Sequence, residues 1–112
     1  MSGTVILVTN NGMRKADEKL QIMLAGKYLE LLAQHSQLPN AICFYTEGVK
    51  LVCEGSPVID QLHELESKGI RLIVCSTCLN YYGLTDKVQI GIVGGMPDII
   101  EAQMNADKVI TI

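Results

Sequence analysis

Short apolar runs alternate with longer stretches of helical periodicity along this chain, and this alternation limits the fold more than any other feature of the sequence. The short runs are rich in β-branched residues and are typical of buried strands: 4–9, 41–45, 70–75, 88–93 and 108–112. Strands that alternate with helices are joined by right-handed crossovers, which build a parallel sheet with helices on both faces. The sequence therefore predicts an α/β fold of three layers, α/β/α, around a mainly parallel sheet of about five strands.

Two of the intervening stretches carry clear helix signals. Residues 15–34 repeat apolar side chains at three- and four-residue steps, which predicts an amphipathic helix with one buried side: Leu20, Met23, Leu24, Tyr28, Leu31 and Leu32. A second helix follows Ser56 and Pro57, because serine can cap free amides and proline fits a first helical turn. We expect this helix to end at Gly69. Its predicted buried stripe is Val58, Leu62 and Leu65.

Length and composition exclude several classes of protein. A chain of 112 residues, 48% of them hydrophobic, can bury one core, so we expect a single domain over residues 1–112. Only 19% of the residues are charged and the net charge is −3, which argues against nucleic-acid binding. No apolar run reaches the roughly 20 residues of a membrane span. The first residues lack the pattern of a signal peptide, so we expect a cytoplasmic protein with reduced thiols.

Four cysteines in a reducing compartment point to thiol or metal chemistry. Open parallel sheets bind their ligands beyond the carboxyl ends of the strands. Cys75 ends the predicted third strand, Cys78 begins the helix or turn that follows, and Cys53 lies in the loop after the second strand. Cys43 differs from these three, because it lies in the middle of an apolar strand, and we interpret it as a core residue.

A thiol that ends a strand and precedes a helix meets free backbone amides, which favour the nucleophilic thiolate. We therefore expect Cys75 to be ionised near neutral pH and open to solvent. Loops at the same edge of the sheet are expected to form a pocket whose backbone amides stabilise the anion. The residues of this predicted pocket are Asn11, Gly12, Gly55, Ser56, Gly94 and Gly95.

Two kinds of site fit the sequence poorly. Structural zinc normally takes four ligands, and the two histidines, His35 and His63, lie on predicted helices without ligand-like spacing. The loop at Asn11 and Gly12 lacks both the three-glycine pattern of dinucleotide binders and the Gly-Lys-Ser/Thr ending of a P-loop. We therefore expect no metal and no organic cofactor.

Three functions remain open for the Cys-x-x-Cys pair. One is sulfur relay, in which a thiolate accepts sulfane sulfur as a persulfide and passes it to another thiol. A second is dithiol oxidoreduction, although the pair follows the third strand and its Ser-Thr spacer is unusual for that chemistry. The third is a homo-oligomeric redox-sensing or interaction module without catalysis. A mean hydropathy of +0.26 favours self-association, because so small a monomer can hide little apolar surface.

Three stretches carry a resemblance to a known family: "FYTEGVKLVCEGSPVIDQLHELESKGI", "CSTCLNYYGL" and the terminal "ADKVITI". With these stretches the chain resembles the DsrE/DsrF-like family of small sulfur-relay proteins, which includes the YchN-like proteins. It looks closest to the C-terminal domain of YedF-type proteins, which are sulfurtransferase-like and linked to selenium metabolism. The resemblance implies an α/β/α domain that assembles as a homo-oligomer, a trimer or a hexamer.

The resemblance also assigns roles to single residues. In relay members of the family the sulfur-carrying cysteine ends the third strand eight residues before a glycine, as Cys75 does before Gly83. Cys78 matches the second thiol of those members that carry a Cys-x-Thr-Cys motif. Cys53 matches the cysteine of the "CEGSP" stretch in YedF-type sequences, together with the glycine and serine of that stretch.

The chain also departs from these relatives. It shows no TusA-like domain, so the resemblance implies that it works alone or receives sulfur from a separate TusA-like carrier or a cysteine desulfurase. Tyr81 and Tyr82 stand where some relay subunits have an arginine pair. The resulting hypothesis is a cytoplasmic carrier of sulfane sulfur or selenium. Cys75 would hold the persulfide, with Cys78 as the neighbouring or resolving thiol and Cys53 as a third partner.

Overall fold

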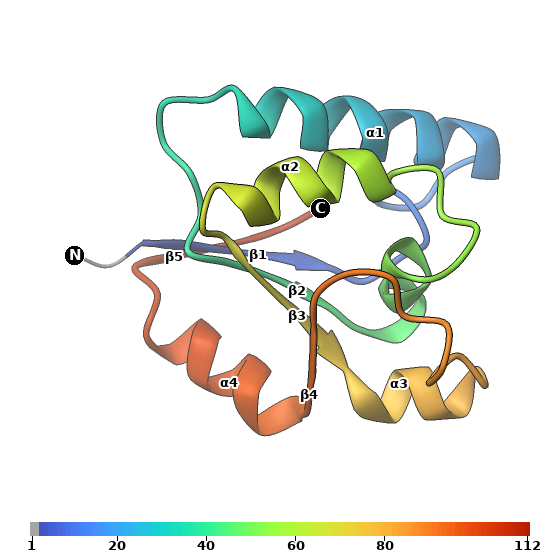
Figure 1. Cartoon of the computed structure of the whole chain (residues 1–112). Helices are drawn as coiled ribbons and strands as arrows, with labels where there is room; N and C mark the ends of the chain where they lie inside the picture. Colours follow the sequence, from blue (N-terminus) through green and yellow to red (C-terminus); the bar gives the residue numbers. More distant parts are fainter. Residues whose placement is uncertain (1–2) are drawn as a thin grey trace.

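Five parallel strands form one sheet in the order β4-β3-β2-β1-β5 (Figure 1). The structure is a computed structural model and describes residues 3–112. The strands are β1 (Thr4–Val8), β2 (Ala41–Phe44), β3 (Arg71–Cys75), β4 (Ile92–Gly94) and β5 (Lys108–Thr111). Four of them lie where the apolar runs predict, and their pairing confirms the expected parallel sheet.

Helices cover both faces of the sheet, which confirms the predicted three-layer α/β/α fold (Figure 1). In the figure, α1 (Glu18–Ala33) and α2 (Ile59–Ser67) lie above the sheet, whereas α3 (Ser76–Tyr81) and α4 (Met96–Met104) lie below it. A 3-10 helix, η1 (Thr46–Val52), follows the carboxyl end of β2. Within the described residues, no helix is long and apolar enough to cross a membrane.

The two central strands form the middle of the hydrophobic core. All of β2 is buried, and so are residues 72–75 of β3. Fully burying an aliphatic or aromatic side chain of this kind contributes about 1.5–3 kcal/mol. Cys43 is fully buried in β2, as expected for a core residue, and burial raises the pKa of its thiol to about 11. The Cys43 thiol therefore stays protonated and unreactive at neutral pH.

α2 follows its sequence signals closely. Its predicted stripe, Val58, Leu62 and Leu65, is buried. The Ser56 hydroxyl accepts a hydrogen bond of 3.2 Å from the Val58 amide, so serine caps the turn that leads into the helix. Gly69 adopts a φ of 90° just after the helix, a conformation that glycine reaches without strain.

α1 buries a side that overlaps the predicted one only in part, because among the predicted residues Tyr28 and Leu32 pack against the core partly buried. Its buried residues are Ala25, Leu29 and Ala33. Several of the larger residues that were expected in the core are exposed instead: Leu20, Met23, Leu24 and Leu31. The two alanines present little bulk, so the helix can lie close to its neighbours with a narrow contact face. The apolar stripe of α1 is wider than that face, and most of its large side chains therefore reach solvent.

The fourth strand is shorter than the predicted run 88–93. β4 begins only at Ile92, because Gly91 turns the chain with a φ of 94° just before it. The preceding residues bond to the end of η1 instead of to the sheet. The Glu54 amide donates to the Lys87 carbonyl and the Gln89 amide to the Val52 carbonyl, both at 2.8 Å.

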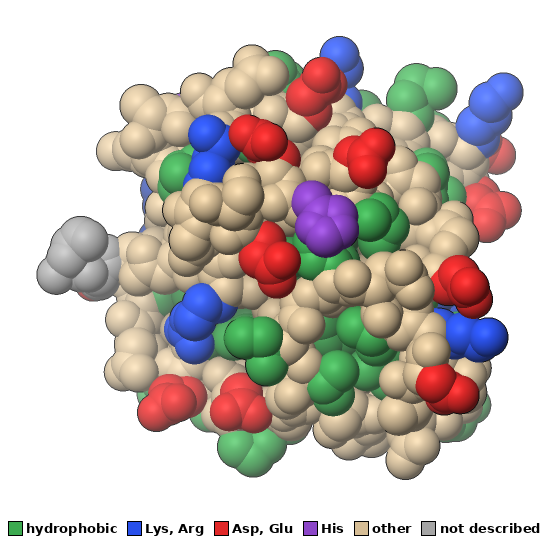
Figure 2. Space-filling model, in the orientation of Figure 1, with side chains coloured by type: hydrophobic (Ala, Val, Ile, Leu, Met, Phe, Trp, Pro, Cys, Tyr) green, Lys and Arg blue, Asp and Glu red, His purple; other side chains and the backbone are tan. Residues whose placement is uncertain are grey.

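Apolar side chains also remain exposed near this edge of the sheet. Figure 2 shows them gathered in the lower half of the face, around β4 and α4. The large exposed hydrophobic residues of these elements are Ile92, Val93, Met96, Ile100 and Met104.

Candidate functional site

The Cys75 and Cys78 side chains meet at the carboxyl end of β3. Cys75 is the last residue of this strand, and Cys78 lies in the first turn of α3, which starts directly after it. One helical turn brings residues three apart to the same face, so the two sulfur atoms lie 3.2 Å apart, with the Cys78 thiol donating to Cys75. The two thiols therefore form one chemical unit.

The two thiols differ in access to solvent. Cys75 is only 1% exposed, whereas Cys78 is half-buried. The expectation that Cys75 is open to solvent is therefore wrong for this chain. Cys75 pairs with Gly94 in the parallel register of β3 and β4, and Cys78 lies against it on the other side, so its neighbours close over it. A molecule in solution meets Cys78 first.

The pKa of the Cys78 thiol is raised above its usual value. Burial is the largest cause, and the hydrogen bond to Cys75 raises the pKa further, while the backbone amide of Thr46 lowers it. Cys78 is therefore mainly a protonated thiol at neutral pH, and its reactivity is expected to grow as the pH rises.

Thr46, which was not among the predicted site residues, contacts the cysteine pair directly. Its backbone amide donates to the Cys78 sulfur over 3.0 Å, across 32 positions of the chain. Thr46 has a φ of 48°, although left-handed backbone costs a non-glycine residue roughly 1–2 kcal/mol and is rare for a β-branched one. Backbone strain of this kind persists only where the surrounding structure holds the residue in place, and it is common at functional sites.

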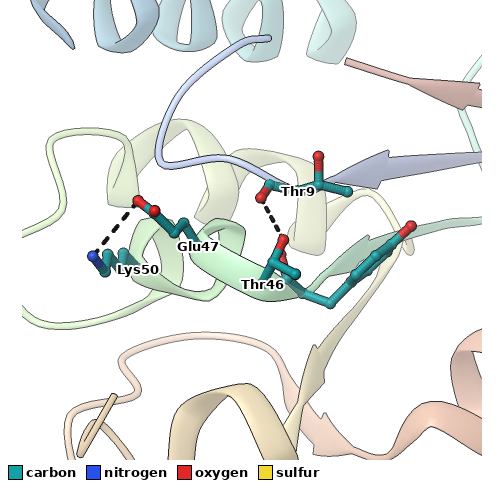
Figure 3. Close-up of polar contacts among 5 residues, drawn as sticks. Thr9, Thr46, Glu47 and Lys50 are labelled. Atoms are coloured by element: carbon teal, nitrogen blue, oxygen red, sulfur yellow. Dashed lines mark hydrogen bonds and ion pairs between the residues drawn. The ribbon is translucent and has the colours of Figure 1, made fainter. Parts of the chain in front are cut away.

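The Thr46 hydroxyl fixes this strained backbone. Its oxygen lies 2.5 Å from the Thr9 carbonyl oxygen, which follows β1, and 2.6 Å from the carbonyl oxygen of Tyr45. Figure 3 shows the hydroxyl pointing to Thr9 from the start of η1. The carboxyl ends of β1, β2 and β3 are thereby joined through one side chain and one amide.

Gly48 makes this arrangement possible. A β-carbon at this position would overlap the backbone carbonyl of Val8. Only glycine therefore lets η1 fold back against the end of β1. In the sequence, Thr46 and Gly48 belong to the Thr-Glu-Gly that directly follows the predicted strand 41–45.

Cys53 belongs to a second group of predicted residues. With Asn11, Gly55 and Ser56 it lines a cavity of about 410 Å³, so the structure brings four of the predicted residues together. Neither Cys75 nor Cys78 lines this cavity. Cys53 is 2% exposed, its thiol donates to the Val49 carbonyl at 3.2 Å, and burial raises its pKa. Its thiol is therefore poorly suited to attack a substrate in solution.

Lys50 and Tyr82 also line this cavity and give it a cationic side. The Lys50 ammonium lies 4.6 Å from the centre of the Tyr82 ring and 3.7 Å from a Glu47 carboxylate oxygen. Figure 3 shows the ion pair along η1. Tyr82 directly follows α3, so the cavity and the cysteine pair share η1 and α3 as their supports.

Two of the glycines that were predicted to bind an anion make contacts within the fold instead. The Gly95 amide donates to the Asp98 carboxylate at 2.8 Å and so belongs to the cap of α4. Gly12 is buried against α1, where a β-carbon would clash with Gln21. Gly94 lies beside Cys75, as its partner in the sheet. Within residues 3–112, no three His, Cys, Asp or Glu side chains are grouped so that they could hold a metal ion.

Solved structures share this fold along nearly their whole length. The ychN protein from E. coli has a TM-score of 0.70 at 22% sequence identity, covering 98% of this chain and 99% of the other. A protein of unknown function from Methanobacterium thermoautotrophicum has a TM-score of 0.69 at 21% identity, covering 97% of both chains. A conserved protein of unknown function from Bacteroides thetaiotaomicron has a TM-score of 0.69 at 19% identity, covering 98% and 95%. Identities this low show a common fold and no more.

The family follows from the sequence as a whole. A comparison with curated proteins gives no match. The model of the DsrE/DsrF-like family matches residues 3–112. The finer likeness to YedF-type proteins and to selenium metabolism stays a prediction. The chain belongs to the DsrE/DsrF-like family, which is generally associated with sulfur relay.

Proposed function

We propose that this protein is a sulfur-relay carrier that holds sulfane sulfur as a persulfide on Cys75, with Cys78 as its partner thiol. The observation that carries the proposal is the 3.2 Å contact between the two sulfur atoms at the carboxyl end of β3. A persulfide on a residue that is 1% exposed would be sheltered from water and from soluble thiols. Selenium in place of sulfur would need the same site.

The chemistry needs only thiols and a donor persulfide. A thiolate of the pair attacks the outer sulfur of the donor, a new S–S bond forms, and the donor leaves as its own thiolate. The carrier then delivers the sulfur by the reverse exchange with an acceptor thiol. A cysteine desulfurase or a TusA-like protein would be a suitable donor. We place this exchange in the cytoplasm, where thiols remain reduced.

The test is the mass of the intact protein after the reduced form is incubated with a cysteine desulfurase and cysteine. We expect a gain of one sulfur atom, removed again by a reductant, and fragment ions that place it on Cys75. A double variant, Cys75→Ser with Cys78→Ser, keeps Cys43 and Cys53 and serves as the matched control. No gain in the unmodified protein, or an equal gain in the double variant, would contradict the proposal.

The same contact favours one second candidate, a dithiol oxidoreductase or redox sensor. A disulfide requires the sulfur atoms to approach to about 2 Å, a movement of little more than an ångström from their positions here. The mass measurement distinguishes the two functions. A redox protein treated with a mild oxidant would lose two hydrogens reversibly and would gain no sulfur from the desulfurase.

We also propose that the chain assembles as a homo-oligomer, a trimer or a hexamer. The exposed apolar side chains of α1 support this proposal. Met23 is 60% exposed and Leu31 is 55% exposed, so both side chains point away from the core. Exposed apolar residues gathered in this way are typical of interfaces between proteins.

Charges on this side of α1 are expected to weaken the assembly. Light scattering after size-exclusion chromatography should give a mass of several chains for the unmodified protein and a smaller mass for Met23→Glu with Leu31→Glu. His63→Glu, on the exposed surface of α2, is the control for added negative charge. A monomer for the unmodified protein, or an unchanged mass for the double variant, would exclude an interface on α1.

A further inference from the structure

We propose that Thr46 is a positioning residue that makes Cys78 the thiol at which sulfur enters the pair, after which Cys75 takes it over. The inference rests on the proposed sulfur-carrier function and adds an order of events and a residue that controls it. Three observations carry it: the amide of Thr46 aimed at the Cys78 sulfur, the strained backbone that aims it, and the hydroxyl that holds this backbone.

The amide favours Cys78 over Cys75 as the attacking thiol. A backbone N–H that donates to sulfur is strengthened when the sulfur becomes a thiolate, because the acceptor then carries a full negative charge. Within the described residues, Cys78 has such a donor in Thr46 at 3.0 Å, whereas the Cys75 sulfur accepts a hydrogen bond from the Cys78 thiol. Cys78 is also the more accessible of the two.

Two exchanges then move the sulfur inward. The Cys78 thiolate attacks the outer sulfur of a donor persulfide, and the donor thiolate leaves, which puts the persulfide on Cys78. Cys75 next attacks the outer sulfur of this persulfide, the S–S bond to Cys78 breaks, and the Cys75 proton passes to Cys78. Each step exchanges one S–S bond for another, so no oxidant or reductant is consumed.

The strained backbone can be separated from the hydroxyl that holds it. Valine or alanine at position 46 removes the hydroxyl and still disfavours a φ of 48°, so the backbone should relax and turn the amide away from Cys78. Glycine also removes the hydroxyl but adopts this φ without strain, so the amide should stay in place. Serine keeps the hydroxyl. Thr46→Val and Thr46→Ala are therefore the test, and Thr46→Gly and Thr46→Ser are the matched controls.

The first readout is the pH dependence of Cys78 alkylation by iodoacetamide, followed at Cys78 by fragment ions, which needs no sulfur donor. We expect Thr46→Val and Thr46→Ala to react about tenfold more slowly at neutral pH, the effect of raising a thiol pKa by about one unit. Thr46→Gly and Thr46→Ser should stay within about threefold of the unmodified protein, since a hydrogen bond that persists keeps its contribution. Chemical unfolding of each variant checks that it is folded.

The second readout is the rate of sulfur loading, which should follow the same order of variants. Alkylation and loading by Thr46→Val and Thr46→Ala that match the unmodified protein would overturn the inference. A Thr46→Gly variant as slow as Thr46→Val would overturn it as well, because the hydroxyl would then act directly. If the unmodified protein takes up no sulfur but alkylation follows the expected order, the carrier function fails and the role of Thr46 at the Cys78 thiol stands.

Discussion

A Cys78→Ser variant is expected to take up sulfur from a persulfide donor on the order of a hundredfold more slowly than the unmodified protein, or not at all. Serine keeps the size of the side chain and a hydrogen-bond donor near Cys75, so the fold should persist. It lacks a nucleophile that works at neutral pH. The remaining thiol, Cys75, is 1% exposed and cannot be approached by a donor without a rearrangement of the chain. The mass of the intact protein, sampled over time, measures the rate.

The other cysteines supply the controls for this experiment. Cys53→Ser should load at the unmodified rate, because the Cys53 thiol is buried and already bonded to a backbone carbonyl. Cys75→Ser should still load on Cys78 but release the sulfur faster to a soluble thiol, since the half-buried position shelters it less. A Cys78→Ser variant that loads Cys75 at the unmodified rate would show that donors reach Cys75 directly.

A Gly48→Ala variant is expected to lose about 2–4 kcal/mol of unfolding free energy. The added β-carbon would overlap the Val8 carbonyl, and a backbone group cannot move aside as a flexible side chain can. η1 would have to lift away from the end of β1, which would also break the contact between Thr46 and Thr9. Equilibrium unfolding in urea, followed by circular dichroism, measures the change.

Gly26→Ala is the matched control for this substitution. Gly26 lies within α1, and a β-carbon there would meet Gln61 at 3.5 Å, which is ordinary contact. Alanine inside a helix is favoured over glycine by roughly 0.5–1 kcal/mol, so this variant should be slightly more stable than the unmodified protein. Equal stability of Gly48→Ala and Gly26→Ala would mean that η1 is free to move away from β1.

The local pattern of apolar residues was enough to predict those strands and helices whose burial follows from their own sequence. β1, β2 and β3 are mostly buried and lie in apolar runs, which is the pattern of strands covered on both faces. β5 also lies in its predicted run, although it is an edge strand and mostly exposed. The contact between Cys75 and Cys78 also follows from local geometry, because three residues make about one helical turn. The stripe of α2 was predictable for the same reason, since one face of that helix meets the core.

Features that depend on distant parts of the chain could not be predicted in this way. The left-handed Thr46 is imposed by Thr9, 37 positions earlier. The burial of Cys75 depends on its pairing with β4, and the burial of Cys53 on its bridge to Val88. The exposed side of α1 depends on how much of the helix the sheet and α2 cover. In each case the periodicity of apolar residues predicts the secondary structure of one segment, but it does not predict which distant segment packs against it.

The pairing between the loop after α3 and the end of η1 has a mechanical consequence. The backbone hydrogen bonds from Glu54 to Lys87 and from Gln89 to Val52 tie this loop to the end of η1, and the loop connects α3 to the edge of the sheet. An outward movement of α3 that uncovers Cys75 would strain these two hydrogen bonds. A sulfur atom that moves from Cys78 to the adjacent Cys75 needs no such opening. Both backbone hydrogen bonds can therefore stay intact during the transfer.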